Sequence, residues 1–247
     1  MPRATPSDPE APRPRRSRRP SEHVAEQLLE AAAAEFAAHG FAGASTRRIA
    51  ERAGAHQPQI NYHFRSKDHL WQATVDHLFA QLPITPPTAG APPAAGSPPA
   101  TRTEPGPVML APNEPDPDPL VPFGIDELAE RFAGTVRDFI RFSAEHPELN
   151  RIINLEATAP SDRLDWLITT HLQPLFTLVD TIWTALRAAG RGADLTTGAV
   201  WELVTSYGAL HFANEPMLVQ LGIHDGDPAT EADAHAARLV ALLLPDA

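Results

Sequence analysis

The chain has 247 residues, 43% of them hydrophobic, so it can bury one large core or two small ones. It has no cysteine, which excludes disulfides and thiolate metal sites. No run of eighteen apolar residues occurs, and the N-terminus is rich in proline and arginine and unlike an apolar signal segment. Together these features predict a soluble cytoplasmic protein.

The formal net charge of −11 argues at first against a nucleic-acid partner. The distribution of charge matters more, because phosphate neutralisation is local. Residues 1–82 hold 11 Lys and Arg against 9 Asp and Glu, whereas the remainder holds 9 against 22. A basic front end on an acidic body is therefore compatible with DNA binding.

Residues 1–20 are mainly proline, arginine and small polar residues, so we expect this basic arm to be disordered. It is either an arm that follows phosphates or enters a minor groove, or a solvated basic tail. Next, Ser21 to His39 has the amphipathic spacing of a helix, with Ser21 as a plausible N-cap and Gly40 as its end.

Residues 46–67, TRRIAERAGAHQPQINYHFRSK, predict a helix-turn-helix. Its first helix runs from Thr46 to Ala53, and Gly54 ends it by adopting a positive φ. The second helix begins near Gln57-Pro58, since proline is tolerated in a first turn. Its outward face has no carboxylate and suits base edges and phosphates; it consists of Gln57, Gln59, Asn61, Tyr62 and His63.

Cations flank this unit. Arg47 and Arg48 lie in the first turn of the first helix, where they oppose the helix dipole, which suggests an external anion. Lys67, the only lysine of the chain, follows the second helix at the start of a further helix that runs from Ser66 to Leu82. It is either simply solvated or, as its position favours, a phosphate ligand.

The composition changes abruptly at residue 83. Residues 83–124 are predicted to be a Pro-rich disordered insertion, because this stretch holds about half of the 27 prolines and no helix or strand can run through it. Amphipathic spacing resumes at Ile125, and Pro174 is able to kink one of the later helices. Helices are predicted over 125–146, 148–157, 161–189, 196–212 and 229–244, with a short turn over 217–221. No alternating strand pattern appears, so the predicted fold is all-α.

Residues 21–71 resemble the DNA-binding domain of the TetR/AcrR family of transcriptional regulators. The shared patterns are A-x-x-x-F-x-x-x-G-F from Ala32, T-x-x-I-A-x-x-A-G from Thr46 and I-x-Y-H-F-x-S-K-x-x-L from Ile60. The resemblance implies a three-helix helix-turn-helix domain with its connecting helix over 21–82. It further implies base contacts from Gln57, Pro58, Gln59 and Arg47, and phosphate contacts from Thr46, Tyr62, His63 and Lys67.

Two positions depart from the family pattern. Asn61 stands where an aromatic residue is common, so a van der Waals contact with DNA becomes a hydrogen-bonding one. His56 stands where a small capping hydroxyl is common, so the entry into the second helix is expected to differ.

The resemblance also implies that residues 125–247 form an α-helical effector-binding and dimerisation domain. The helices over 196–212 and 229–244 would then pair across a two-fold axis, so that a dimer reads two half-sites. Aromatic residues of this half are either core or the wall of an effector pocket. The candidate ligand contacts are Asn150, Arg163, Trp166, His171, Trp183, Tyr207 and His211.

Catalytic and metal motifs are absent from the sequence. His171, His211, Glu156 and Asp180 lack the spacing of a helical metal site, and no nucleophile elbow, phosphate loop or H-E-x-x-H occurs. We therefore expect no enzyme and no cofactor, but a homodimeric repressor that binds a palindromic operator on double-stranded DNA and is released by a small-molecule effector, without a membrane partner. The alternatives are a constitutive or architectural DNA-binding protein whose C-terminal half only dimerises, and an enzyme with a DNA-binding head.

Overall fold

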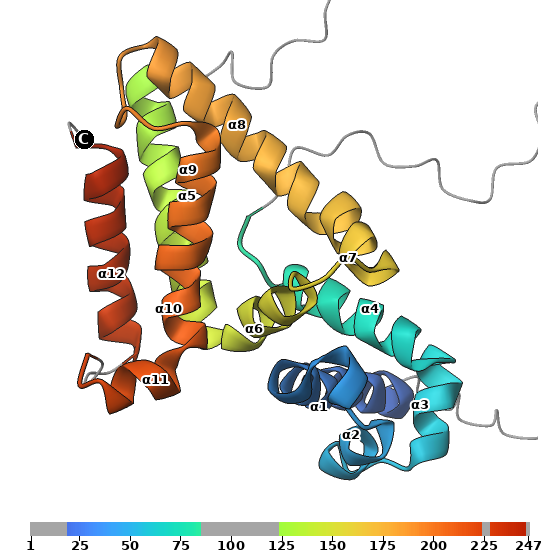
Figure 1. Cartoon of the computed structure of the whole chain (residues 1–247). Coiled ribbons are helices and arrows are strands. Elements are labelled where there is room, and N and C mark those ends of the chain that lie inside the picture. The colour runs from blue at the N-terminus through green and yellow to red at the C-terminus, as the bar shows by residue number, and fades with distance from the viewer. Residues whose placement is uncertain (1–18, 85–123, 224–227, 246–247) are drawn as a thin grey trace, which may run out of the picture.

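The computed structural model describes residues 19–84, 124–223 and 228–245, and within these ranges every regular element is a helix (Figure 1). The predicted all-α fold is thus confirmed. The predicted disordered arm (1–20) and Pro-rich insertion (83–124) lie almost entirely outside the described residues. None of the described helices is long and apolar enough to cross a membrane.

In the first four helices the predicted glycines act as stop residues, but α1 begins at Arg19, so the prediction that Ser21 is its N-cap is wrong. Gly40 adopts φ 63° and ψ 176° and breaks α1, and Gly54 ends the α2 turn with φ 62°. Ser45 caps α2 by accepting a hydrogen bond from the Arg48 N–H, and Ser66 caps α4 in the same way through His69. The helices are α1 (Arg19–Gly43), α2 (Thr46–Arg52), α3 (Gln57–Phe64) and α4 (Lys67–Phe79).

The second half begins at Ile125, as predicted, and has more breaks than the amphipathic spacing indicated. The predicted turn over 217–221 is the short helix α11. The helices are α5 (Ile125–Glu145), α6 (Pro147–Glu156), α7 (Asp162–Leu167), α8 (Gln173–Ala188), α9 (Thr197–Glu202), α10 (Leu210–Ala213), α11 (Glu215–Gln220) and α12 (Pro228–Leu243).

Two π-helical segments, Ile168–Leu172 and Leu203–Ala209, divide helices that were predicted to be continuous. The first ends just before Pro174, whose missing N–H and ring disfavour a normal α-turn there. The second contains Gly208, where an added Cβ would clash with the side chains of Ile140 and Leu239. A wider turn and a glycine therefore let the second π-helical segment approach α5 and α12.

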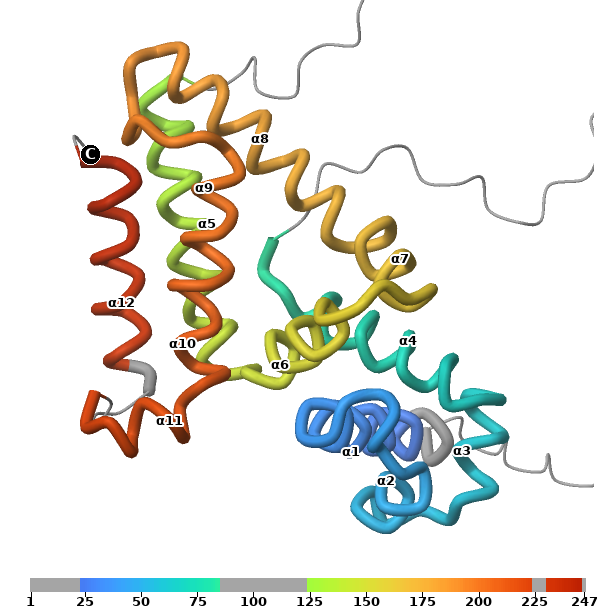
Figure 2. The backbone as a smooth tube through the Cα atoms, in the orientation of Figure 1, coloured from blue at the N-terminus to red at the C-terminus, as the bar shows by residue number. Residues whose placement is uncertain are grey.

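Two hydrophobic cores organise the molecule. The first fills the space between α1, α2, α3 and α4 and continues into α6 and α7, where Trp71 and Trp166 meet edge-on with ring centroids 5.7 Å apart. The second lies between α5, α8, α9, α10 and α12 and includes Trp183. In the tube view α4 runs from the end of α3 along α1 toward α6 (Figure 2). The helix-turn-helix is thus packed against the C-terminal half through α1 and α4.

Candidate nucleic-acid interface and adjoining cavities

The outward face of α3 is open to solvent. Ile60 anchors the helix with 1% of its surface exposed, while Tyr62 on the other side is 79% exposed. Gln57, Pro58 and Asn61 are exposed as well. These side chains are amides, an apolar ring and a phenol, so they offer donors, acceptors and contact area without a repelling charge.

At the N-terminus of α3 the Gln59 side chain takes the place of a capping hydroxyl group. The Gln59 Oε1 accepts a hydrogen bond from the His56 backbone N–H at 2.7 Å, which is the Gln59 half of a capping box. The predicted change at His56 is therefore offset by a reciprocal bond from the third helical residue. One acceptor of Gln59, a predicted base-reading residue, is used inside the protein.

The start of α2 lies against the start of α3. The Gln57 Nε2 donates a long hydrogen bond of 3.5 Å to the Thr46 Oγ1. A predicted base contact and a predicted phosphate contact are thereby held together on one side of the helix-turn-helix. Tyr62 and His63 follow on α3 with their rings in an edge contact, 5.1 Å between centroids.

Lys67 connects the start of α4 with the end of α1. Its Nζ donates to the Ala42 carbonyl oxygen at 3.4 Å and lies 4.8 Å from the centroid of the Phe41 ring. The stem is thus packed while the ammonium group stays near the surface, since the side chain is only half-buried. This arrangement suits the predicted phosphate contact.

The two arginines at the start of α2 differ from each other. Arg47 is exposed and pairs with Glu51 at 2.9 Å. Arg48 binds Glu35 of α1 at 2.8 Å and the Gly43 carbonyl oxygen at 3.1 Å. The expectation of an external anion at Arg48 is therefore wrong, because a carboxylate of the same chain neutralises its charge.

Glu35 is the internal anion of the helix-turn-helix domain. It is 7% exposed, and its Oε1 also accepts from the Ser45 backbone N–H at 2.8 Å. Burial alone would raise the pKa of the carboxyl group, but the hydrogen bonds from Arg48 and Ser45 outweigh it and lower the pKa below its ordinary value. The ionised carboxylate thus joins α1 to the α2 cap.

Replacing Gln59 tests both of its roles. Gln59→Glu keeps an oxygen for the His56 N–H and should leave the unfolding midpoint nearly unchanged. It loses the amide donor and faces phosphate with a charge, so we expect operator binding to fall by about 1–3 kcal/mol more than binding to random duplex. Gln59→Leu should in addition lower the free energy of unfolding by about 0.5–2 kcal/mol. Equal losses on both DNAs, measured by fluorescence anisotropy, would show that Gln59 does not read bases.

Replacing Lys67 with alanine is expected to weaken binding to all duplexes. The slope of log K against log salt should become shallower by about one unit, since one fewer counterion is released. Arg131→Ala removes an exposed charge from α5 and serves as the matched control with an unchanged slope. If both variants keep the wild-type slope, Lys67 does not contact phosphate.

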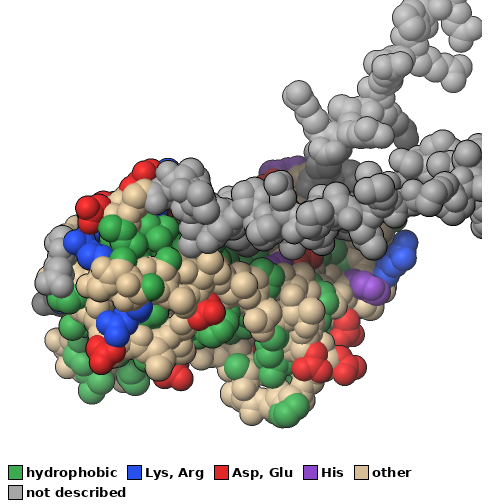
Figure 3. Space-filling view, turned by 90° about the horizontal axis from the view of Figure 1, so that it is seen from above, with side chains coloured by type: hydrophobic (Ala, Val, Ile, Leu, Met, Phe, Trp, Pro, Cys, Tyr) green, Lys and Arg blue, Asp and Glu red, His purple; other side chains and the backbone are tan. Residues whose placement is uncertain are grey.

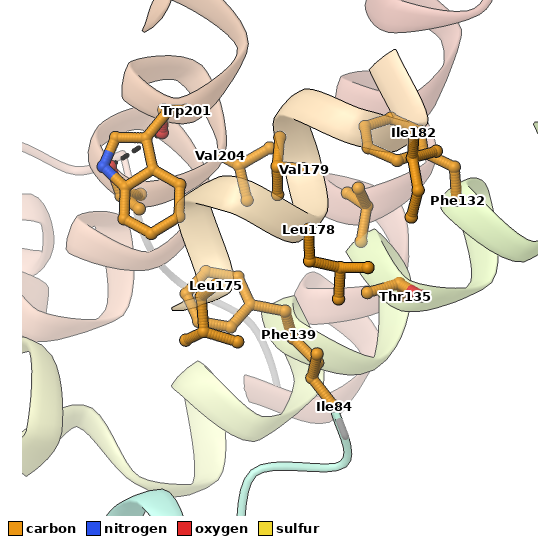
Figure 4. A pocket seen from close by; sticks show the side chains of 12 residues that line it. Ile84, Phe132, Thr135, Phe139, Leu175, Leu178, Val179, Ile182, Trp201 and Val204 are labelled. Carbon is orange, nitrogen blue, oxygen red and sulfur yellow. Dashed lines mark hydrogen bonds between the residues drawn. The ribbon is translucent and has the colours of Figure 1, made fainter. Parts of the chain in front are cut away.

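The C-terminal half contains an apolar cavity of about 70 Å³, and no charged side chain lines it. Apolar side chains of α5 and α8 surround it, and Ile84 closes it from the segment after α4 (Figure 4). Its wall is formed by Ile84, Phe132, Thr135, Val136, Phe139, Leu175, Leu178, Val179, Ile182, Trp201, Val204 and Thr205. We call it the apolar cavity.

A second cavity of about 140 Å³ adjoins the first and shares Phe139, Leu175, Trp201 and Thr205 with it. Asn150 lies in its wall, so we call it the Asn150 cavity. The side chains of Phe79 and Leu82, at the end of α4, line the same space. Of the predicted ligand contacts, Asn150 is thus placed at a cavity that touches both halves of the molecule.

His171 and Arg163 lie at the junction with α4. His171 Nε2 and Asp76 Oδ1 form a hydrogen bond of 2.8 Å, and the His171 ring stacks on Phe79 at 4.2 Å between centroids. Burial lowers the pKa of His171, although Asp76 opposes the shift. Arg163 pairs with Glu156 and lies over the Phe41 ring at 3.7 Å.

The other predicted ligand contacts lie away from both cavities. Trp166 packs against Trp71 in the first core, and Trp183 donates from Nε1 to the Leu195 carbonyl oxygen at 2.9 Å in the second core. Tyr207 is 41% exposed, and His211 forms a hydrogen bond with Glu231. Trp201, which lines both cavities, was missed because periodicity does not reveal how a helix is rotated about its axis.

The four residues weighed as metal ligands do not converge. His171 bonds Asp76, His211 bonds Glu231, and Asp180 accepts from Thr197 at 2.6 Å. Glu156 accepts hydrogen bonds from Ser161 and Arg163. Among the described residues no three His, Asp or Glu side chains are grouped to hold a metal ion.

Comparison with known proteins agrees with this architecture. Residues 28–74 match the model of bacterial regulatory proteins of the tetR family. The fold is similar to that of HlyIIR, a hemolysin II transcriptional regulator, with a TM-score of 0.53 at 15% identity over 91% of this chain and 98% of that one. No curated protein matches the sequence.

Two further solved structures share the fold. A putative transcriptional regulator, SCO4942 from Streptomyces coelicolor, aligns with a TM-score of 0.52 at 18% identity over 89% of this chain and 96% of that one. NalD of Pseudomonas aeruginosa, the secondary repressor of the MexAB-OprM efflux pump, aligns with a TM-score of 0.51 at 15% identity over 92% of this chain and 100% of that one. Residues 28–74 therefore match the helix-turn-helix domain of the tetR family, and the described part of the chain has a fold similar to that of these three regulators.

Proposed function

We propose that the protein is a homodimeric repressor that binds a palindromic operator and releases it when a small molecule occupies the C-terminal half. The observation that carries this proposal is the position of Phe79 and Leu82. Both belong to the end of the DNA-binding domain, and both line the Asn150 cavity. An occupant of that cavity would touch the segment that orients the helix-turn-helix.

The mechanism is a shift between two conformers. A ligand can change DNA binding only if it prefers one arrangement of α4 over another. The hydrogen bond between His171 and Asp76 and the ring stack on Phe79 attach α4 to the first π-helical segment. Displacement of this π-helical segment would move α4 and thereby change the spacing between the two recognition helices of a dimer.

The outer face of α12 suits a second copy of the chain. Ala234, Ala237 and Ala241 are exposed along one side of this helix, and Leu242 beside them is 59% exposed. Small side chains let two helices approach closely, and an exposed leucine provides apolar area to bury.

On the face seen in Figure 3, acidic side chains are spread over the body of the molecule and do not gather in one patch.

The dimer is tested by paired substitution. Ala237→Glu with Ala241→Glu should give a monomer in sedimentation velocity and weaken binding to a full palindrome by at least about tenfold, while a half-site is bound as before. Ala188→Glu with Ala189→Glu adds the same charge to exposed positions at the end of α8 and should change neither. A dimer that survives the first pair would contradict this interface.

The operator and the response to ligand are tested with the wild-type chain. Selection from random duplexes should yield an inverted repeat, since a symmetric dimer presents two recognition helices. Ligands found by thermal shift should then lower affinity for that repeat. Tight binding of the repeat without any ligand that stabilises the protein would favour the constitutive alternative.

A further inference from the structure

Asn150 on α6 has an unused donor. Its side chain is 6% exposed, and Nδ2 is fully buried and makes no hydrogen bond with any described residue. The neighbouring amide of Asn154 does not supply a partner for it, because Asn154 Nδ2 donates to the Asn150 backbone oxygen at 2.7 Å. A buried donor without an acceptor is unfavourable, and natural proteins rarely keep one without a reason.

The other side chains that line the two cavities limit which kind of ligand could accept a hydrogen bond from this donor. No Asp, Glu, Lys, Arg or His side chain lines the apolar cavity or the Asn150 cavity. The hydroxyls of Thr135 and Thr205 already donate within their own helices, to the backbone oxygens of Arg131 and Trp201. The other polar side chains in these walls, Asn154 and Ser206, are uncharged. An ionised group would lose its hydration there without a counter-charge, so a charged ligand is excluded.

The cavity sizes limit the ligand further. Volumes of about 70 and 140 Å³ hold roughly seven water molecules at about 30 Å³ each, and a few more non-hydrogen atoms than that when the atoms are covalently bonded and so lie closer together. Phe139, Leu175 and Trp201 line both cavities, so a single molecule that occupied both would lie against all three side chains. An aromatic or short aliphatic body fits this space better than a polar one.

From these observations we infer that the effector is a small uncharged molecule with an apolar body and one hydrogen-bond acceptor, such as a carbonyl or ether oxygen. Its oxygen accepts from Asn150 Nδ2, and its body fills the apolar cavity between α5 and α8. This inference deepens the proposed function and rests on it, since it names the chemical class that would act at the same site.

The position of Asn150 also explains how binding of such a ligand would influence the DNA-binding domain. α6 carries Asn150 between Leu149 and Ile152, which are buried in the first core with α1. A ligand held by Asn150 therefore contacts α6, the second π-helical segment and the end of α4 at once. An apolar molecule without an acceptor would occupy the cavity but make no hydrogen bond to α6.

Acetophenone and ethylbenzene are matched probes for this inference. They differ by the carbonyl oxygen, and both are of the predicted size. Titration calorimetry of the full chain without DNA should show that acetophenone binds at least as tightly as ethylbenzene. In Asn150→Leu, acetophenone should bind about tenfold or more weakly relative to ethylbenzene, because its carbonyl then lacks a donor. Thr205→Val, in the same wall, removes a hydroxyl that is already bonded and should leave the ratio unchanged.

Several outcomes would overturn the inference. An unchanged ratio in Asn150→Leu shows that Asn150 is not the donor, and absence of binding by both probes shows that the cavities do not admit this class. Tighter binding of benzoate than of acetophenone shows that the ligand is an anion. Should the leucine variant not fold, Asn150→Ala provides the same ratio. If only the ligand class is wrong, the protein still binds its operator but does not bind the probes as predicted. If the proposed function is wrong, the probes still bind the protein but do not change its affinity for DNA.

Discussion

Replacing Trp71 with alanine is expected to lower the free energy of unfolding by about 3–5 kcal/mol, the largest effect among the substitutions considered. Trp71 is 1% exposed and lies in the first core, where α4 meets α7 through Trp166. Removal of the indole leaves a cavity that helices fixed at both ends cannot close. Urea denaturation followed by circular dichroism measures the loss.

The control for Trp71 is Trp201, which is only half-buried and borders the cavities. Trp201→Ala should cost less than Trp71→Ala, because fewer contacts are lost. A loss below about 1 kcal/mol for Trp71→Ala would show that α7 packs against α4 only weakly. The attachment of the DNA-binding domain to the C-terminal half would then need another explanation.

Replacing Glu35 with alanine is expected to lower the free energy of unfolding by about 1.5–3 kcal/mol at neutral pH. The carboxylate accepts from Arg48 and from the Ser45 N–H, and both bonds hold α2 against α1. Glu51→Ala is the matched control on the same domain, because the Glu51 pair with Arg47 is exposed at both ends and contributes about 0–1 kcal/mol.

The contribution of Glu35 to the free energy of unfolding should decrease as the pH falls. Its pKa is lower in the folded chain than the ordinary value of 4.5. The stabilisation is therefore complete well above pH 4.5 and is lost as the pH falls through that value toward the lower folded pKa. The stability gap between wild type and Glu35→Ala should shrink on acidification, with the exposed Glu51→Ala gap as reference. A gap that widens would contradict the assigned hydrogen bonds.

Local chemistry was enough to predict most of the helices. Gly40 and Gly54 end helices because they accept positive φ, and Ser45 and Ser66 begin them by capping. These effects involve residues within a few positions of each other, so periodicity and residue type reveal them. The exposed outer face of α3 follows from the same 3.6-residue repeat.

The features that sequence missed depend on contacts between distant residues. Arg48 was expected to face an external anion, but its partner is thirteen residues away on α1. The π-helical segments arise where helices must fit against α5 and around Pro174, which a linear pattern does not encode. The cavity walls come from α4, α5, α6, α8 and the second π-helical segment, so helix rotation decides which aromatic residue lines them.

The hydrogen bond that Gln59 makes at the start of α3 limits how this helix can be varied to bind new promoters. A library that varies α3 to obtain a different operator preference can change Gln57, Asn61 and Tyr62, because none of them accepts the helix-closing bond. At Gln59, only side chains that still offer an oxygen to the His56 N–H keep the start of α3 closed. Selections for stable protein that randomise this position should therefore favour Gln and Glu, because most other residues lose about 0.5–2 kcal/mol of folding free energy.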